Sequence, residues 1–126
     1  MRCVGPTLAR SEITHIRQSL AFAPEIEEAV ELFSLANSST RLKILLLLDQ
    51  LKELCVCDLA EMLDVSLSAV SQHLAKLRAY GLVTSRREAQ TIFYRLTDHP
   101  FVGKLDRLVF DQVTLLDEVP ARTEKE

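Results

Sequence analysis

The sequence predicts a mainly α-helical fold with one small β-hairpin. Apolar residues recur at helical spacing in five segments, and two short β-prone runs stand between the fourth segment and the fifth. The length fits this prediction, because 126 residues with 48% hydrophobic content can bury one core but are too few for a two-domain cofactor enzyme. We therefore expect one compact domain.

The first helix is expected to follow an N-terminal arm. Residues 1–24 contain a Gly-Pro pair and scattered apolar positions, and Pro24 is followed closely by three glutamates, as at a helix start. Residues 25–35 are predicted to form an amphipathic helix, because apolar side chains recur at i, i+4 and i+7. These side chains are Ile26, Val30 and Phe33.

Three further helices are predicted in the middle of the chain. The polar run 37–39 supplies an N-cap for a strongly apolar helix, 42–51, which must be largely buried. A short helix with Leu59, Met62 and Leu63 follows the cysteine pair and stops at Asp64-Val65. Ser66 caps the next helix, which ends before Gly81 at the C′ position. Its stripe is expected to be buried and consists of Leu67, Val70, Leu74 and Leu77.

The C-terminal part is predicted to hold the hairpin and a last helix. Residues 82–87 and 91–96 are β-prone and are separated by Glu88-Ala89-Gln90. A helix over about 100–117 has one apolar side, formed by Val102, Leu105, Val109, Val113 and Leu116. Because this stripe has no partner of its own, we expect the terminal helices to form the seam of a homodimer. The predicted domain organisation is an N-terminal arm (1–24), one folded domain (25–118) and a polar tail (119–126).

This order of elements is that of a winged helix-turn-helix. In that motif a tight turn joins a short helix to a longer one, and the longer helix presents small polar side chains to the major groove of DNA. The candidate DNA-binding residues are Ser68, Ser71, Gln72, His73 and Lys76 on the helix, and Arg86 and Arg87 on the hairpin. The alternative interpretation is a solvated polar face with incidental arginines.

The net charge of −3 would by itself argue against a nucleic-acid partner. However, residues 66–95 hold five cations and one carboxylate, a net charge of +4, which leaves −7 on the rest of the chain. All but one of the acidic residues therefore lie outside the predicted DNA-binding part. This distribution predicts modest nonspecific affinity for DNA and a dependence on correct dimer geometry.

A specific stretch of the chain resembles a known family. Residues Glu53 to Val83, ELCVCDLAEMLDVSLSAVSQHLAKLRAYGLV, together with FYRL at 93–96, are similar to the ArsR/SmtB family of metal-responsive repressors, and the likeness covers roughly residues 26–117. The resemblance implies a homodimeric winged-helix repressor that binds a near-palindromic operator and releases it on binding a metal ion or metalloid. Ala89 and Gln90 stand at the wing tip, where relatives usually have a glycine.

The spacing of Cys55 and Cys57 suits a metal site only at a helix start. Within a helix their side chains would point about 200° apart. At a junction between extended chain and helix they share a face, and the helix N-terminus favours thiolate over thiol, although the neighbouring Asp58 opposes this somewhat. Soft ions need three or four ligands, and Cys3 on the arm is the obvious third. Two buried hydrophobes, and an incidental thiol at Cys3, are the alternatives.

The resemblance to the ArsR/SmtB family also bears on which ion is the inducer. Cadmium- and lead-responsive relatives share the CVCDL motif and complete the site with N-terminal cysteines, whereas arsenic-responsive relatives carry a third cysteine where this chain has Ala60. The expected inducer is therefore a thiophilic ion: As(III), Cd, Pb or Zn. The family's second site, on the terminal helix, would use Asp98, His99 and Asp111, but Pro100 stands where a ligating His is expected and Asp111 and Thr114 replace a later His and acid. We expect that site to be absent or vestigial.

The sequence also leaves room for a function other than metal sensing. A thiol redox or persulfide sensor on the same fold would use Cys55 and Cys57. An enzyme is not expected, because the sequence has no CxxC, no Gly-rich phosphate loop and no apparent catalytic constellation. A structural zinc module would lack ligands. The longest apolar run, 44–48, is too short to span a bilayer, so we expect a cytoplasmic protein without a membrane partner.

Overall fold

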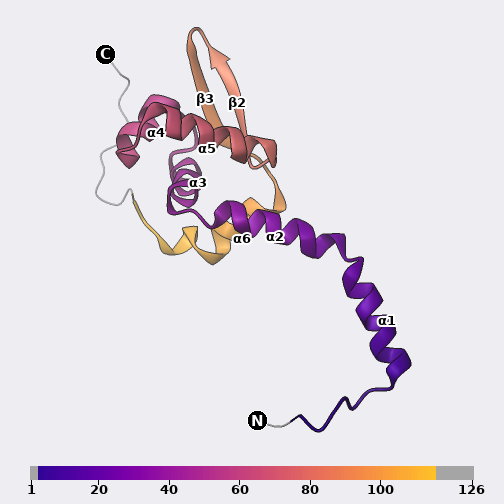
Figure 1. Cartoon of the computed structure of the whole chain (residues 1–126). Coiled ribbons are helices and arrows are strands. Elements are labelled where there is room, and N and C mark those ends of the chain that lie inside the picture. Colours follow the sequence, from indigo (N-terminus) through magenta and orange to yellow (C-terminus); the bar gives the residue numbers. More distant parts are fainter. Residues whose placement is uncertain (1–2, 116–126) are drawn as a thin grey trace. The chain divides into compact units, whose positions relative to one another are not determined.

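The computed structural model describes residues 3–115 (Figure 1). In chain order the elements are α1 (Arg10–Ala21), α2 (Pro24–Ala36), α3 (Ser39–Leu51), β1 (Leu54–Cys55), α4 (Val56–Leu63), α5 (Leu67–Ala79), β2 (Val83–Glu88), β3 (Thr91–Leu96), α6 (Pro100–Leu108) and a 3₁₀ turn (Phe110–Gln112). The chain divides into two units between Glu31 and Leu32. The predicted order of helices and hairpin is confirmed.

The N-terminal unit differs from the expected arm because it contains a helix. In α1, Ile13, Ile16 and Leu20 recur at i, i+3 and i+7, a helical period that the Gly-Pro start of the segment obscured. No residue of α1 is buried. The boundary was expected at residue 24, where α2 begins, whereas the two units divide within α2, after Glu31. The polar tail 119–126 lies outside the described residues.

The core of the second unit is built around α3 and α5. Ile44, Leu45 and Leu48 of α3 are at most 1% exposed, as the strongly apolar run predicted. The side chains of Val70, Leu74 and Leu77 from α5 pack in the same cluster. Burial of such apolar surface is the main term that stabilises the unit.

Leu67 was wrongly expected to be buried, and the apolar side chain of Met62 is exposed as well. Leu67 in the first turn of α5 is 53% exposed, and Met62 of α4 is 51% exposed. Both lie next to the turn 64–66, which has the αL residue Asp64 after α4 and Ser66 before α5. Apolar periodicity does not show where a packed face ends, and here it ends at the turn.

The sheet has three antiparallel strands in the order β1-β3-β2. β1 was not predicted as a strand: Leu54 pairs with Tyr94 and Cys55 with Phe93. The wing itself, β2 and β3, is confirmed, although the loop is only Ala89-Gln90 because Glu88 pairs with Thr91. Figure 1 shows this hairpin extending beyond α5. The sheet therefore joins the cysteine segment to the wing.

The last helix is shorter than predicted. α6 ends at Leu108 instead of 117, and a 3₁₀ turn buries Phe110. Beyond it, the Gln50 side chain of α3 donates to the carbonyl of Val113 and accepts from the N–H of Leu115 at 3.1 Å. Because a side-chain amide satisfies these backbone groups, the segment has no need of helical hydrogen bonds.

The stripe that was predicted to form the dimer seam is covered by the protein itself in its first part. Val102 and Leu105 lie in the protein's own core, and Leu116 lies outside the described residues. The exposed apolar stripe is instead on α2, where Ile26, Val30 and Phe33 are 55%, 57% and 63% exposed. No helix within residues 3–115 is long and apolar enough to cross a membrane.

Candidate DNA-binding surface and cysteine pair

The recognition helix α5 is capped and oriented by its own sequence. The Ser66 hydroxyl accepts from the N–H of Ala69 at 3.1 Å, which confirms the predicted N-cap. At the other end Gly81 has φ +76°, a conformation that a glycine adopts without strain. Packing of Val70, Leu74 and Leu77 leaves the opposite side of the helix to solvent.

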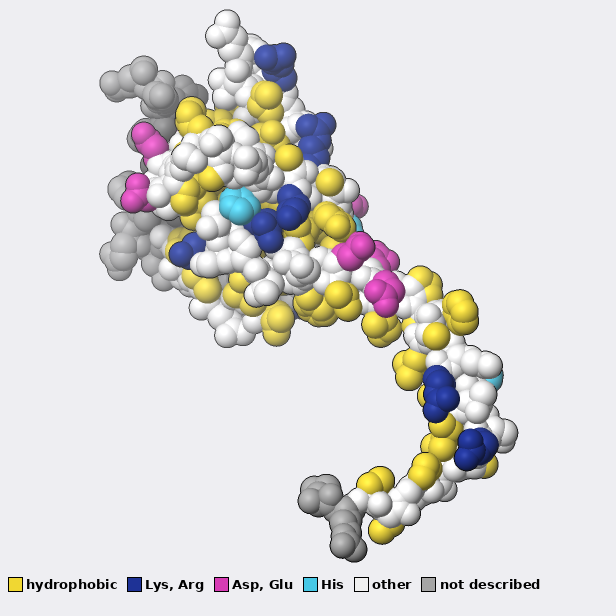
Figure 2. Space-filling view, in the orientation of Figure 1, with side chains coloured by type: hydrophobic (Ala, Val, Ile, Leu, Met, Phe, Trp, Pro, Cys, Tyr) yellow, Lys and Arg dark blue, Asp and Glu magenta, His cyan; other side chains and the backbone are white. Residues whose placement is uncertain are grey.

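The structure brings the predicted helix residues to that open side. Ser68, Ser71, Gln72 and Lys76 are all exposed, and His73 is half-buried. On the face drawn in Figure 2, Lys and Arg side chains lie beside a histidine. The ring of His73 contacts a residue of α3 that the sequence analysis did not single out: Arg41 Nη1 lies 3.3 Å from His73 Nδ1. Burial, then the positive charges of Arg41 and Lys76, lower the pKa of His73.

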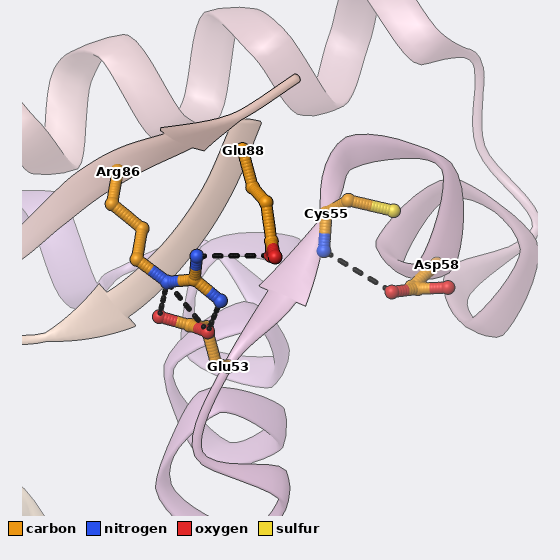
Figure 3. A network of polar contacts seen from close by, with 5 residues as sticks. All are labelled: Glu53, Cys55, Asp58, Arg86 and Glu88. Atoms are coloured by element: carbon orange, nitrogen blue, oxygen red, sulfur yellow. Dashed lines mark hydrogen bonds and ion pairs between the residues drawn. The ribbon is translucent and has the colours of Figure 1, made fainter. Parts of the chain in front are cut away.

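The two wing arginines have different surroundings. Both are exposed, but Arg86 makes a bidentate ion pair with Glu53, at 2.6 to 3.0 Å, and a second contact with Glu88 at 3.1 Å (Figure 3). Its guanidinium also lies 4.8 Å from the centre of the Phe93 ring. The guanidinium lowers the pKa of Glu53. Arg86 is therefore engaged by carboxylates in this state, whereas none of the described contacts engages Arg87.

Cys55 and Cys57 lie at the junction that their spacing required. Cys55 is extended (φ −90°, ψ 170°) and is the N-cap of α4, while Cys57 lies in the first turn. Asp58 completes a capping box: its carboxylate accepts from the Cys55 N–H at 3.1 Å (Figure 3). Its own N–H faces the Cys55 sulfur. Cys57 is exposed and Cys55 half-buried, so neither is an ordinary core residue.

The expected preference for thiolate does not hold at Cys55. Burial raises the pKa of this thiol, and the carboxylate of Asp58 adds to the increase, which outweighs the helix N–H groups. Cys3 is exposed and belongs to the other unit. Among residues 3–115 no three His, Cys, Asp or Glu side chains are grouped closely enough to hold a metal ion.

The three residues of the second family site do different things. His99 caps α6, since its Nδ1 accepts from the N–H of Phe101 at 3.0 Å. Asp98 and Asp111 are exposed, and Asp111 makes the smallest contribution to the raised pKa of Asp49, which comes first from burial and then from Asp106. Within residues 3–115 these three side chains do not form a group that could hold a metal ion.

Sequence reasoning missed two residues that organise these surfaces, Arg41 and Glu53. Both act through contacts between elements distant in sequence, and nothing in their local pattern marks them. It also missed the capping role of Asp58, which the spacing of Cys55 and Asp58 fits.

Comparison with known proteins places the chain in a family. Residues 38–85 match "Bacterial regulatory protein, arsR family". The chain is 47% identical over 70 residues to the arsenical resistance operon repressor of Escherichia coli K12. The aligned stretch covers 56% of this chain and 60% of that protein. The chain is 33% identical over 111 residues to a transcriptional repressor SmtB homolog of Synechocystis, covering 88% and 83%.

A solved structure agrees with these sequence matches. The structure of reduced HlyU from Vibrio cholerae aligns with a TM-score of 0.59 at 42% identity and covers 68% of this chain and 93% of that one. The helix-turn-helix, the wing and these similarities together show that the chain belongs to the arsR family of bacterial regulatory proteins, which are DNA-binding transcriptional regulators and not enzymes.

Proposed function

We propose that the protein is a transcriptional repressor that binds operator DNA as a homodimer and releases it when a thiophilic metal ion or metalloid is bound by Cys55 and Cys57. The observation that carries the proposal is the position of this pair at the start of α4, the first helix of the helix-turn-helix. Two of the similar proteins are repressors by name, and one of them belongs to an arsenical resistance operon.

The DNA-binding part of the proposal rests on exposed residues. α5 offers Ser68, Ser71, Gln72 and Lys76 to the major groove, and Arg87 on the wing to a phosphate. A dimer is needed for two such helices to reach successive major grooves. The exposed stripe Ile26, Val30 and Phe33 on α2 supports that assembly, because monomeric proteins rarely leave such a face in water.

The donor set fits a soft ion in part. Two thiols within three residues match the chemistry of As(III), Cd, Pb or Zn, but two donors are too few for these ions. Cys3 is the proposed third ligand, from the same protomer or its partner. The ion would supply strong bonds to sulfur at the start of α4. Because Cys55 is protonated at neutral pH, it must lose a proton before it can ligate.

The surroundings of Cys55 explain how ligation could reach the DNA-binding elements. Cys55 caps α4 through the box with Asp58, and it pairs with Phe93 of the wing strand β3. Two residues earlier, Glu53 holds Arg86 of β2. A shift of this short segment therefore changes both the helix-turn-helix and the wing. A useful switch needs about 1 to 3 kcal/mol of coupling between inducer and operator.

The test is operator release by fluorescence anisotropy. Arsenite, lead, cadmium and zinc are titrated in parallel into the protein–operator complex, and sulfur-to-metal charge-transfer absorbance is followed in the same samples. We expect release with at least one ion, loss of release in Cys55→Ser and Cys57→Ser, and weaker release in Cys3→Ser. Release by Cys55→Ser at wild-type ion concentrations would contradict the cysteine mechanism without affecting the DNA-binding function.

A second candidate, a thiol redox sensor, is favoured by one observation: a similar solved protein is described by its reduced state. In that case hydrogen peroxide would take two electrons from Cys55 and Cys57, giving a disulfide and two waters. Mass spectrometry after mild oxidation distinguishes the two functions, because only the redox sensor loses two hydrogens when it releases DNA without any metal.

A further inference from the structure

Arg41 is oriented by the protein itself. It lies in the first turn of α3, and its Nε donates to the carbonyl of Leu35 at 2.7 Å. Leu35 is 3% exposed and lies in the last turn of α2, where helical carbonyls lack a partner within the helix. The guanidinium therefore satisfies a buried helix end, and this contact holds it in place beside α5.

The same guanidinium decides which nitrogen of His73 carries the proton. Arg41 Nη1 lies 3.3 Å from His73 Nδ1, and an arginine can only donate. Nδ1 must therefore accept, so that a neutral imidazole carries its single hydrogen on Nε2. Burial and the charges of Arg41 and Lys76 lower the pKa of His73, so the ring is neutral near pH 7.

The other ring nitrogen of His73 is available to an external partner. Within residues 3–115 Nε2 makes no hydrogen bond, yet no buried side-chain nitrogen or oxygen in this range lacks a partner. Nε2 therefore reaches solvent. It does so on the exposed side of α5, next to Gln72 and one turn before Lys76.

We propose that Arg41 is a positioning residue for DNA recognition: it fixes His73 as the Nε2–H tautomer, so that α5 presents a neutral hydrogen-bond donor to the operator. The matching group on DNA is an acceptor, either a phosphate oxygen or the N7 or O6 atom of a purine. The inference rests on the DNA-binding function and extends the recognition surface to a residue on α3.

The tautomer is tested directly by ¹⁵N NMR of the His73 imidazole. In the wild type at pH 7.5 or above we expect the chemical shifts of a protonated Nε2 and an unprotonated Nδ1. Arg41→Ala should shift both nitrogens toward the averaged values of a free imidazole, and Arg41→Lys, which keeps a donor, should restore most of the difference. Identical spectra for wild type and Arg41→Ala would overturn the proposal.

The effect on DNA is measured with an operator duplex selected by the wild-type protein from a randomised library. Arg41→Ala should bind about five- to tenfold more weakly, the loss expected for one hydrogen bond. His73→Ala should lose as much, and the double variant no more than either. Lys43→Ala, which removes an exposed cation from the same helix, is the matched control and should bind within twofold of wild type, roughly the effect of one distant charge.

Salt dependence separates positioning from a direct contact. If Arg41 itself bound a phosphate, Arg41→Ala would make the slope of log K against log salt shallower by about 0.9, and that result would overturn the proposal. An unchanged slope with weaker binding supports it. If the wild type selected no operator, the proposed function would fail; if it did and Arg41→Ala matched Lys43→Ala, only this inference would fail.

Modified operators identify the acceptor. Methylphosphonate linkages remove individual phosphate oxygens, and 7-deazapurines remove N7. The substitution that abolishes the difference between wild type and Arg41→Ala marks the group that His73 contacts. If no substitution reduced the difference, the proposed hydrogen bond would be ruled out.

Discussion

Replacing Cys55 by serine separates the role of this residue in folding from its role in sensing. Cys55 is the N-cap of α4, and sulfur is a weak acceptor for the helix N–H groups. Serine is among the preferred N-cap residues, and a good cap is typically worth about 0.5 to 2 kcal/mol over a poor one. Taking about 0.5 to 1 kcal/mol, because the sulfur already forms part of the capping box, we expect Cys55→Ser to raise Tm by roughly 2 to 8 °C.

The same variant should lose its response to the inducer. Wild-type protein is expected to lose about 5- to 150-fold in operator affinity when saturated with an inducing ion. Cys55→Ser should bind the operator as wild type does and show no such loss. Calorimetry gives Tm, and anisotropy with and without the ion gives the two affinities. Cys57→Ser is the matched control: the same atom changes at an exposed first-turn position, so Tm should stay constant while release is lost.

Two results would refute this reasoning. A lower Tm in Cys55→Ser would show that the sulfur contributes more through packing than an oxygen gains as a cap. Normal release in Cys55→Ser would show that the inducer does not act through this thiol.

Three further predictions follow from single contacts. Ala89 has φ +55°, a conformation that costs a non-glycine residue about 1 to 2 kcal/mol, and the freedom of glycine in the unfolded chain offsets part of this cost. Ala89→Gly should therefore stabilise the wing by about 0.5 to 1 kcal/mol and raise Tm. An unchanged or lower Tm would contradict this. Glu53→Gln should release Arg86 toward a phosphate and steepen the slope of log K against log salt for operator binding by about 0.9. Glu61→Gln is the control, because it makes the same charge change at an exposed residue without that contact. Equal slopes in the two variants would disprove the release of Arg86. Because the pKa of His73 is lowered, the folded protein binds this proton at a lower pH than the unfolded chain does, so the contribution to stability is present above pH 6.5 and is lost as pH falls through the lowered pKa. Between pH 8 and pH 5, Tm should therefore fall less in His73→Gln than in wild type. Parallel profiles would show that His73 is not the group responsible.

Much of the fold was visible in local patterns. The helical period and the cap signals predicted α2 to α5, and the two β-prone runs predicted the wing. These features depend on residues three or four apart, or on alternation along a strand, which a sequence displays directly. The cysteine pair was also placed correctly at a helix start, because the i, i+2 spacing allows few other geometries for shared ligation.

The errors came from contacts between segments distant in sequence. Periodicity extended the last helix to residue 117, but the Gln50 side chain binds the backbone beyond α6. The expected dimer stripe on that helix was assigned from apolar spacing alone, and Val102 and Leu105 proved to belong to the protein's own core. An apolar stripe shows that a face must be covered but does not say by what.

The sequence by itself determined the order of elements, the recognition helix with its polar side, and the two thiols at the start of α4. Only the tertiary structure decided the state of the side chains around them. It pairs Arg86 with Glu53, turns Nδ1 of His73 toward Arg41 and buries Cys55 enough to raise its pKa. Charge, proton position and hydrogen-bonding capacity depend on which atoms lie within a few ångströms, and that distance is set by packing between elements, which local sequence patterns do not encode.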